Sequence, residues 1–230
     1  MSRENNDAKN AIFAAIRQNL AASLPFDAAH RAHHTQKDAD FTASVLNDFP
    51  KAALIENFRE NLEFVGGKFS HVYDESEAAE VLFSIIREKN ARQIAISDSP
   101  LVKKIAGYLK SSAEFIENAA TDVLFESDLG VTGAQWAIAE TGTLVLESES
   151  ERHRLTSLVP PVHVCVLEAR NIRRTLGEIL EILQRDLSRT ITFVTGASRT
   201  SDIELTLAIG VHGPGELHVI LIDKAEETVN

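Results

Sequence analysis

The chain has 230 residues and a hydrophobic content of 44%, which is enough for one α/β domain with a short extension. Its formal net charge of −11 argues against general binding of nucleic acids, because neutralising phosphates requires clustered lysine and arginine. The same charge disfavours binding to an anionic membrane surface.

The cysteine count limits the redox chemistry of this chain. Cys165 is the only cysteine, which excludes an internal disulfide and an iron–sulfur cluster held by four cysteines of one chain. The chain starts with the polar segment MSRENNDAKN, which has no signal-peptide core, and no apolar run reaches membrane-spanning length. We therefore expect a soluble, cytoplasmic protein that spans no membrane and has no cofactor of its own.

The first part of the chain predicts helices. Apolar residues at helical spacing indicate one helix over Asp7–Ala22 and a second, interrupted at Pro50, over Phe41–Phe64. A Gly-Gly pair ends the second helix, and a different pattern begins after it. We assign residues 1–63 to a helical N-terminal extension and residues 64–230 to an α/β domain.

Three histidines lie between these two predicted helices. His30 and His34 would share a helix face, with His33 beside them, and histidines in that spacing can bind a metal. No carboxylate or cysteine completes a convincing ligand set. A surface connector without metal is therefore the favoured interpretation.

Strand and helix patterns alternate along the rest of the chain. Helices are expected at Glu75–Lys89, Pro100–Lys110 and Thr175–Leu187. Strands are expected at Phe69–Tyr73, Gln93–Ile96, Ala113–Ile116, Asp122–Phe125, Ala134–Ala139, Thr143–Glu147, Val162–Leu167, Ile191–Val194 and Leu217–Ile222. Such alternation indicates parallel βαβ units. The predicted fold is α/β, with an open, mostly parallel sheet flanked by helices.

The first candidate site is the polar turn Glu140-Thr141-Gly142, which leads into Thr143 and faces the basic loop that ends at Arg154. Apolar residues before the turn would desolvate the Glu140 carboxylate, which could then act as a base or a nucleophile. Catalytic and binding residues often lie on loops that rigid strands hold in place. In the alternative, favoured interpretation, Glu-Thr-Gly only fixes the turn through hydrogen bonds.

The second candidate site follows a predicted buried strand, in the segment Thr195–Asp202. Its glycine permits close backbone approach, and its polar side chains suit a carboxylate or phosphate; the candidate ligand-binding residues are Gly196, Ser198, Arg199 and Thr200. In open α/β sheets such loops gather beyond the carboxyl ends of the strands. Alternatively, these residues only cap and turn the chain, and Arg199 pairs with Asp202 or Glu204. No Gly-Lys-Ser/Thr follows, so this is not a Walker motif.

Three further histidines lie in the second half of the chain. His212, within a glycine-rich turn, could act as an acid or base near neutral pH, or could only bond to backbone. His163 and His218 lie inside apolar strands, where a structural role is the favoured interpretation.

Three segments together resemble a known family. They are GVTGAQWAIAETGTLVLES, RLTSLVPPVHVCVLEARNI and TGASRTSDIELTLAIGVHGPGELHVILID, and they look like the LUD domain of the lactate utilization proteins, specifically the C-type subunit. The resemblance covers roughly Phe64 to Asp223. It implies a fold related to sugar-phosphate isomerases and CoA transferases. It also implies a role with two iron–sulfur partner subunits that oxidise L-lactate to pyruvate in bacteria.

Three functional hypotheses remain after this resemblance. The preferred one is a non-redox subunit of a lactate-oxidising complex, which contributes assembly or a surface for a small carboxylate or phosphate. The second is an enzyme of CoA transferase or sugar-phosphate isomerase type, since CoA transferases carry a nucleophilic glutamate near a glycine-containing turn and Glu140 is reminiscent of it. The third is a ligand-binding regulator. The chain has no Gly-x-Gly-x-x-Gly fingerprint, which argues against a self-sufficient dehydrogenase.

Overall fold

The computed structural model describes residues 13–15, 50–148, 154–185, 188–201, 207–209 and 213–224. The chain divides into two compact units, Met1–Phe49 and Pro50–Asn230. In the first unit the described residues form a turn of helix inside the predicted helix Asp7–Ala22. His30, His33 and His34 lie outside the described residues. Within the described ranges, no helix is both long enough and apolar enough to cross a membrane.

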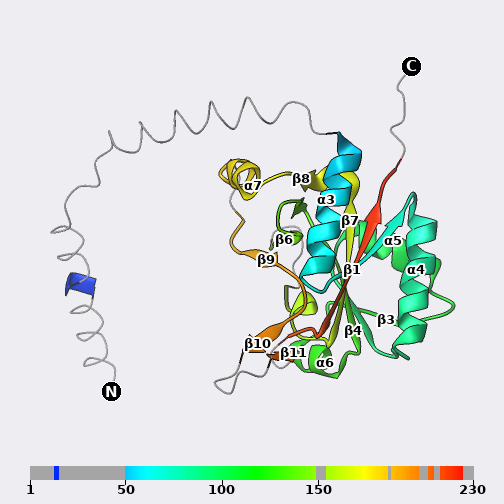
Figure 1. Ribbon diagram of the computed structural model, residues 1–230. Helices are drawn as coiled ribbons and strands as arrows, with labels where there is room; N and C mark the ends of the chain where they lie inside the picture. The colour runs from blue at the N-terminus through cyan, green and yellow to red at the C-terminus, as the bar shows by residue number, and fades with distance from the viewer. Residues whose placement is uncertain are drawn as a thin grey trace, which may run out of the picture. The chain divides into compact units, whose positions relative to one another are not determined.

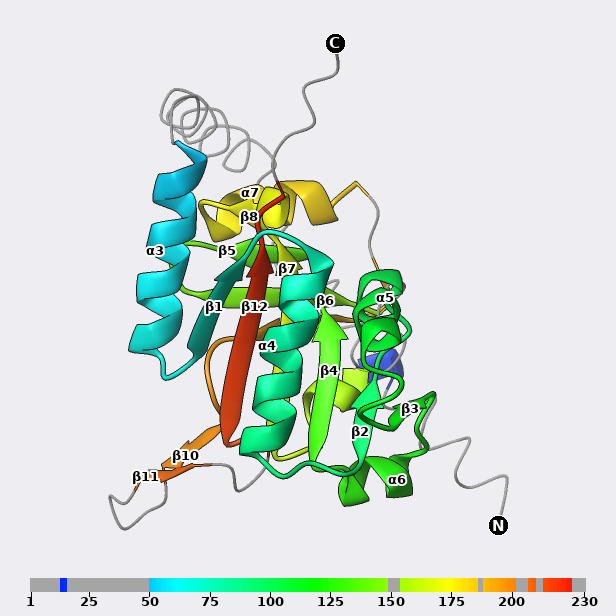
Figure 2. The ribbon, with the colours of Figure 1, turned by 90° about the vertical axis from the view of Figure 1, so that its right-hand side faces the viewer.

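A six-stranded parallel sheet forms the centre of the second unit, in the strand order β1-β12-β7-β4-β2-β3 (Figure 2). The strands are β1 (Lys68–Val72), β2 (Ile94–Ile96), β3 (Phe115–Glu117), β4 (Leu129–Gly133), β7 (Val162–Glu168) and β12 (Glu216–Ile222). Both faces of β7 are buried, which is the rule for parallel strands covered on two sides. The predicted α/β fold with a mostly parallel, helix-flanked sheet is confirmed.

Two helices cover one face of this sheet, α4 (Glu75–Glu88) and α5 (Pro100–Tyr108) (Figure 1). Asp74 begins α4 by accepting a hydrogen bond from the Glu77 N–H at 2.9 Å, and proline starts α5 where its missing N–H does no harm. Leu82 and Ile105 pack with Val164 of the sheet in one apolar core. This face is therefore filled by aliphatic side chains.

Helix α3 (Lys51–Phe64) packs against the opposite face (Figure 1). Phe58 and Leu62 of this helix are fully buried, in a core with Cys165 of β7 and Val219 of β12. The helix starts after Pro50, as the predicted interruption requires. The predicted domain boundary between residues 63 and 64 falls within this helix, whereas the compact unit begins at Pro50.

A second, four-stranded sheet shares that face with α3, in the order β8-β5-β6-β9. Its strands are β5 (Trp136–Ile138), β6 (Thr143–Glu147), β8 (Ile172–Arg173) and β9 (Ile191–Val194), and they run across the main sheet (Figure 2). The outer face of this sheet is covered by α7 (Leu176–Leu183) through Ile179 and Leu183. The sequence pattern predicts a single sheet. The tight turn after β5 instead forces an antiparallel pair, because a parallel neighbour needs a long crossover.

Smaller elements account for the remaining differences from the prediction. The expected strand Asp122–Phe125 lies in helix α6 (Thr121–Glu126), where only Leu124 is buried and Phe125 is 75% exposed. Strand β4 was not predicted because two glycines interrupt its apolar pattern. Gly130 is required there, since a Cβ would collide with the Thr156 carbonyl. The other elements are the 3₁₀ turns η1 (Arg154–Ser157) and η2 (Ala169–Asn171), and the antiparallel strands β10 (Arg199–Ser201) and β11 (Leu207–Ile209).

Candidate functional site

A cavity of about 220 Å³ lies between the loop after β9 and the start of β7. We call it the loop pocket. All of the described residues that line it are uncharged at neutral pH: Ser157, Leu158, His163, Phe193, Val194, Thr195, Gly196, Ala197, Ser198, Gly213, Pro214 and Leu217. Hydroxyl groups, backbone amides and one imidazole are therefore the polar groups that the described lining offers to a ligand.

His163 is the most unusual residue of the loop pocket. Its side chain is 1% exposed, and its Nε2 lies 2.8 Å from the Oγ1 of Thr132, which is itself fully buried. Its other ring nitrogen, Nδ1, is buried without a hydrogen-bond partner. Burial lowers the pKa of His163 from its ordinary value of 6.5 to about 3, because the charged ring would lose its hydration. The imidazole is thus neutral at physiological pH.

The loop Thr195–Ser198 forms one wall of this pocket and is held at both ends. Gly196 has a φ of +75°, and a side chain there would collide with the Val65 carbonyl, so this position requires glycine. The Ser198 N–H donates to the Pro214 carbonyl at 2.8 Å. These contacts fix the loop against the end of α3 and against the segment before β12.

A chain of threonine hydroxyls joins the two candidate sites that were found in the sequence. The Oγ1 atoms of Thr141 and Thr143 are 2.7 Å apart, and those of Thr143 and Thr195 are 2.8 Å apart. Gly142, with a φ of +63°, lies against the backbone of α3, where a Cβ would collide with the Leu62 nitrogen. The turn after β5 and the loop after β9 are therefore neighbours in the folded chain.

The position of the loop Thr195–Ser198 differs from the prediction. The loop was expected beyond the carboxyl ends of a parallel sheet, but β9 belongs to the second sheet and pairs antiparallel with β6. The loop pocket consequently lies near the amino ends of the main-sheet strands, where His163 of β7 is paired with Leu217 of β12.

Glu140 lies on the surface and outside the loop pocket. Its side chain is exposed, so the expected desolvation by apolar neighbours is wrong. Its Oε1 accepts a hydrogen bond from the Leu176 N–H at 2.8 Å, at the first residue of α7. A carboxylate stabilises a helix amino terminus by satisfying a free N–H and by its charge. This contact favours the interpretation of Glu140 as a residue that fixes the turn.

Arg199 and Arg154, the two arginines among the candidate ligand-binding residues, lie outside the loop pocket. Arg199 is exposed, and its Nη2 donates to the Val65 carbonyl at 2.9 Å, just after the last turn of α3. This bond caps a helix carboxyl end, where a cation is favoured. Arg154 is exposed at the start of η1, and its carbonyl accepts from the Ser157 hydroxyl at 2.7 Å. Thr200 lies in β10, and His212 lies outside the described residues.

A second cavity, of about 410 Å³, lies at the carboxyl ends of β4 and β7, where ligands bind in many open α/β sheets. Three of its polar lining side chains, those of Gln135, Trp136 and Glu147, already have hydrogen-bond partners. The Glu147 carboxylate accepts from Trp136 Nε1 at 3.1 Å and from the Ser188 hydroxyl at 2.8 Å, while the Glu147 N–H donates to Gln135 at 2.6 Å. The loop pocket, which holds a buried nitrogen without a partner, is the stronger candidate.

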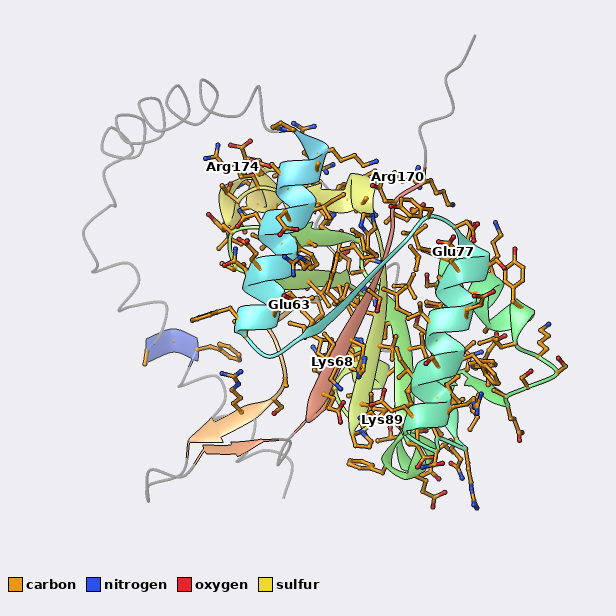
Figure 3. The ribbon with its side chains drawn as sticks, turned by 45° about the vertical axis from the view of Figure 1, so that its right-hand side comes forward. Glu63, Lys68, Glu77, Lys89, Arg170 and Arg174 are labelled. Atoms are coloured by element: carbon orange, nitrogen blue, oxygen red, sulfur yellow. The ribbon has the colours of Figure 1, made fainter. Side chains whose placement is uncertain are left out.

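His218, the other buried histidine, lies beside a charged cluster at the amino end of β12. Lys68 and Lys89 donate to the Glu216 carboxylate at 2.8 and 2.6 Å, and Figure 3 shows both lysines near this end of the strand. These bonds hold the pKa of Glu216 at about 2, well below its ordinary range. His218 lies 3.3 Å from Glu216, and burial lowers its pKa. These contacts agree with a structural role for His218.

The pocket-lining residues Ser157 and His163, and Thr132, which bonds to His163, were not selected from the sequence as site residues. For His163, the sequence signal was a polar residue inside an otherwise apolar strand. The same signal is present at His218, so it does not tell which of the two histidines lines a pocket. No group of three or more His, Cys, Asp or Glu that could hold a metal ion is found in the described part of the chain.

Comparison with known proteins identifies relatives in bacteria. Residues 55–222 match the LUD domain family. A lactate utilization protein C of Deinococcus radiodurans is 31% identical over 179 residues, which cover 75% of this chain and 81% of that protein. An uncharacterised protein of Neisseria meningitidis is 37% identical over 110 residues, 46% of this chain and about half (47%) of that protein. The crystal structure of a DUF162 family protein from Deinococcus radiodurans has a TM-score of 0.60 at 24% identity, covering 76% of this chain and 99% of that one.

Proposed function

The chain belongs to the LUD domain family, and we propose that it serves lactate utilization as a subunit without a redox group of its own. The observation that carries this proposal is the 31% identity, over most of both chains, to a protein named for lactate utilization. In the proposed complex, two iron–sulfur partner subunits oxidise L-lactate to pyruvate. This chain contributes assembly and a ligand-binding surface.

The proposed division of labour follows from the side chains that this subunit offers. Oxidation of lactate to pyruvate releases two electrons and two protons, and a group that accepts the electrons must be present. The one cysteine, Cys165, is fully buried in β7, where it packs in the core. We therefore place electron transfer in the partner subunits.

The proposed ligand of this subunit is a small carboxylate or phosphate, bound in the loop pocket. The loop Thr195–Ser198 supplies hydroxyls and a left-handed glycine, and backbone amides in such turns can cradle an anion. The cavity, about 220 Å³, is larger than the roughly 150 Å³ that suffices for benzene in an engineered core. A compound of about the size of benzene would therefore fit.

Growth and pull-down experiments in the native host test the proposed role. Deletion of this chain should impair growth on L-lactate and leave growth on glucose unchanged, and the wild-type gene should restore it. A tagged copy should retain two iron–sulfur proteins during purification from lactate-grown cells. Normal growth of the deletion strain on L-lactate, or activity of the purified chain alone with a soluble electron acceptor, would contradict the proposal.

A further inference from the structure

The imidazole of His163 makes only one of the two hydrogen bonds that its ring nitrogens can form. Nε2 contacts the Thr132 hydroxyl, whereas Nδ1 is buried without a partner. A buried polar atom of this kind is rare in native proteins, because it loses its bond to water and gains nothing in return. Its neighbours on the same face of β7, Cys165 and Leu167, are apolar and pack in the core. Core packing at this position therefore does not require a histidine.

The chemistry of the loop pocket narrows the kind of group that can bond to Nδ1. The ring is neutral, so Nδ1 is a donor in one tautomer and an acceptor in the other, and the Thr132 hydroxyl can complement either form. A hydroxyl group on a ligand has the same versatility. A carboxylate would require one tautomer and an ammonium group the other, so the tautomer alone excludes neither of them. A charged group would in addition lose its hydration next to the buried Nδ1, which an uncharged hydroxyl avoids at lower cost.

We infer that His163 binds the hydroxyl group of a short-chain hydroxy acid, whose carboxylate lies against the loop Thr195–Ser198. The choice of acid rests on the proposed function, whereas the assignment of the hydroxyl rests on the geometry of His163. Because protein atoms cover Nδ1, contact requires a small movement of the loop or of the ring. The loop Thr195–Ser198, which lines the pocket, is bonded by Ser198 to Pro214 and by Thr195 to Thr143.

A pair of ligands that differ by one hydroxyl tests this inference directly. L-Lactate and propionate have the same carboxylate and carbon chain, so the loop should treat them alike. The thermal unfolding temperature of the full chain is measured while each acid is titrated, with sodium chloride as the ionic-strength control. L-Lactate at about 100 times its Kd should raise Tm by about 5–10 °C. Propionate should bind at least about tenfold more weakly, since it leaves Nδ1 without a partner.

Two variants test whether His163 causes the preference for L-lactate over propionate. The double variant Thr132→Val/His163→Leu removes both polar partners together and should respond equally to the two acids. His218→Leu is the matched control, because His218 is also a buried histidine in a neighbouring strand but is bonded to Glu216 outside the pocket. It should retain the wild-type preference. Equal responses of the wild-type protein to the two acids, or an unchanged preference in the double variant, would overturn the inference.

A measurement on the unaltered protein covers the case in which the double variant fails to fold. With ¹⁵N-labelled histidine, L-lactate should shift the ring nitrogens of one neutral imidazole, and propionate should not. Spectra without that difference would contradict the role of His163. A response to inorganic phosphate alone would also overturn it, while leaving the loop as an anion site. The growth phenotype of the deletion strain is independent of all these results, so failure here is distinguishable from failure of the proposed function.

Discussion

The double variant Thr132→Val/His163→Leu should also change how stability depends on pH. In the wild-type protein the His163 pKa falls from 6.5 in the unfolded chain to about 3 in the folded chain. Between these values the unfolded state binds a proton that the folded state does not. The free energy of unfolding therefore decreases as the pH falls, by about 1.4 kcal/mol per pH unit. From pH 7.5 to pH 5.0 this amounts to about 2 kcal/mol.

At pH 7.5 the same double variant should be close to the wild type in stability. It loses one buried hydrogen bond, which contributes about 1 kcal/mol net, and it removes the unpaired Nδ1, whose burial costs about 1–3 kcal/mol. We expect a net change between about zero and a gain of about 2 kcal/mol. At pH 5.0 the variant should be about 2 kcal/mol more stable relative to the wild type than it is at pH 7.5.

Urea unfolding followed by fluorescence of the single tryptophan, Trp136, measures these differences. Glu75 and Glu216, whose pKa values are held at about 2 by lysine partners, also lose stabilising charge in acid. They are present in both proteins, so their contributions cancel in the comparison. A double variant whose stability falls with pH as steeply as that of the wild type would refute the assignment of a buried, neutral His163.

Three further predictions concern the turn Glu140-Thr141-Gly142 and the helix cap Arg199. Glu140→Gln keeps an oxygen that can accept the hydrogen bond from the first N–H of α7. The variant should lose at most about 1 kcal/mol of stability in urea unfolding, and it should restore growth of the deletion strain on L-lactate. A variant that folds but does not restore growth would indicate a catalytic carboxylate. Arg199→Ala removes the hydrogen bond that caps α3 and should lower the free energy of unfolding by about 1 kcal/mol. Any increase of Tm that phosphate causes in the wild type should persist in this variant. Loss of that increase would show that Arg199 is an anion ligand. Gly142→Ala should destabilise the folded protein by about 3 kcal/mol or more, because the new Cβ would collide with α3. The control Gly107→Ala, in open space on α5, should be neutral or slightly stabilising. Equal effects of the two substitutions would contradict the close packing of the turn on α3.

The α/β class could be predicted from the sequence because it depends on local pattern. Helices α4 and α5 have apolar residues at helical spacing, with Asp74 and Pro100 as starting signals. The strands β7 and β12 are mainly apolar runs, each with one internal histidine. Partners along one helix or strand are close in sequence, so these elements were found with nearly correct bounds. The short helix α6 was mistaken for a strand because six residues are too few to show a period.

The second sheet required the tertiary structure. The sequence indicated strands for β5, β6 and β9, and the antiparallel partner of a strand is not specified by its own composition. The turn Glu140-Thr141-Gly142 closes against α3, through the Asn61 side-chain amide donating to the Ala139 carbonyl at 2.9 Å. That contact spans 78 residues of sequence. Long-range contacts of this kind set the arrangement of the sheets.

The candidate site was determined in part by the sequence and in part by folding. The sequence identified the turn at Thr141–Thr143 and the loop at Thr195–Ser198, because glycines and hydroxyls cluster there. Only the fold brought them together, through a bond between Thr143 and Thr195 across 52 residues. Only the fold showed that Glu140 and Arg199 bond to helix ends, and that Nδ1 of His163 is buried without a partner. The physical reason is that a polar side chain's role depends on which atoms surround it, and those atoms come from distant parts of the chain.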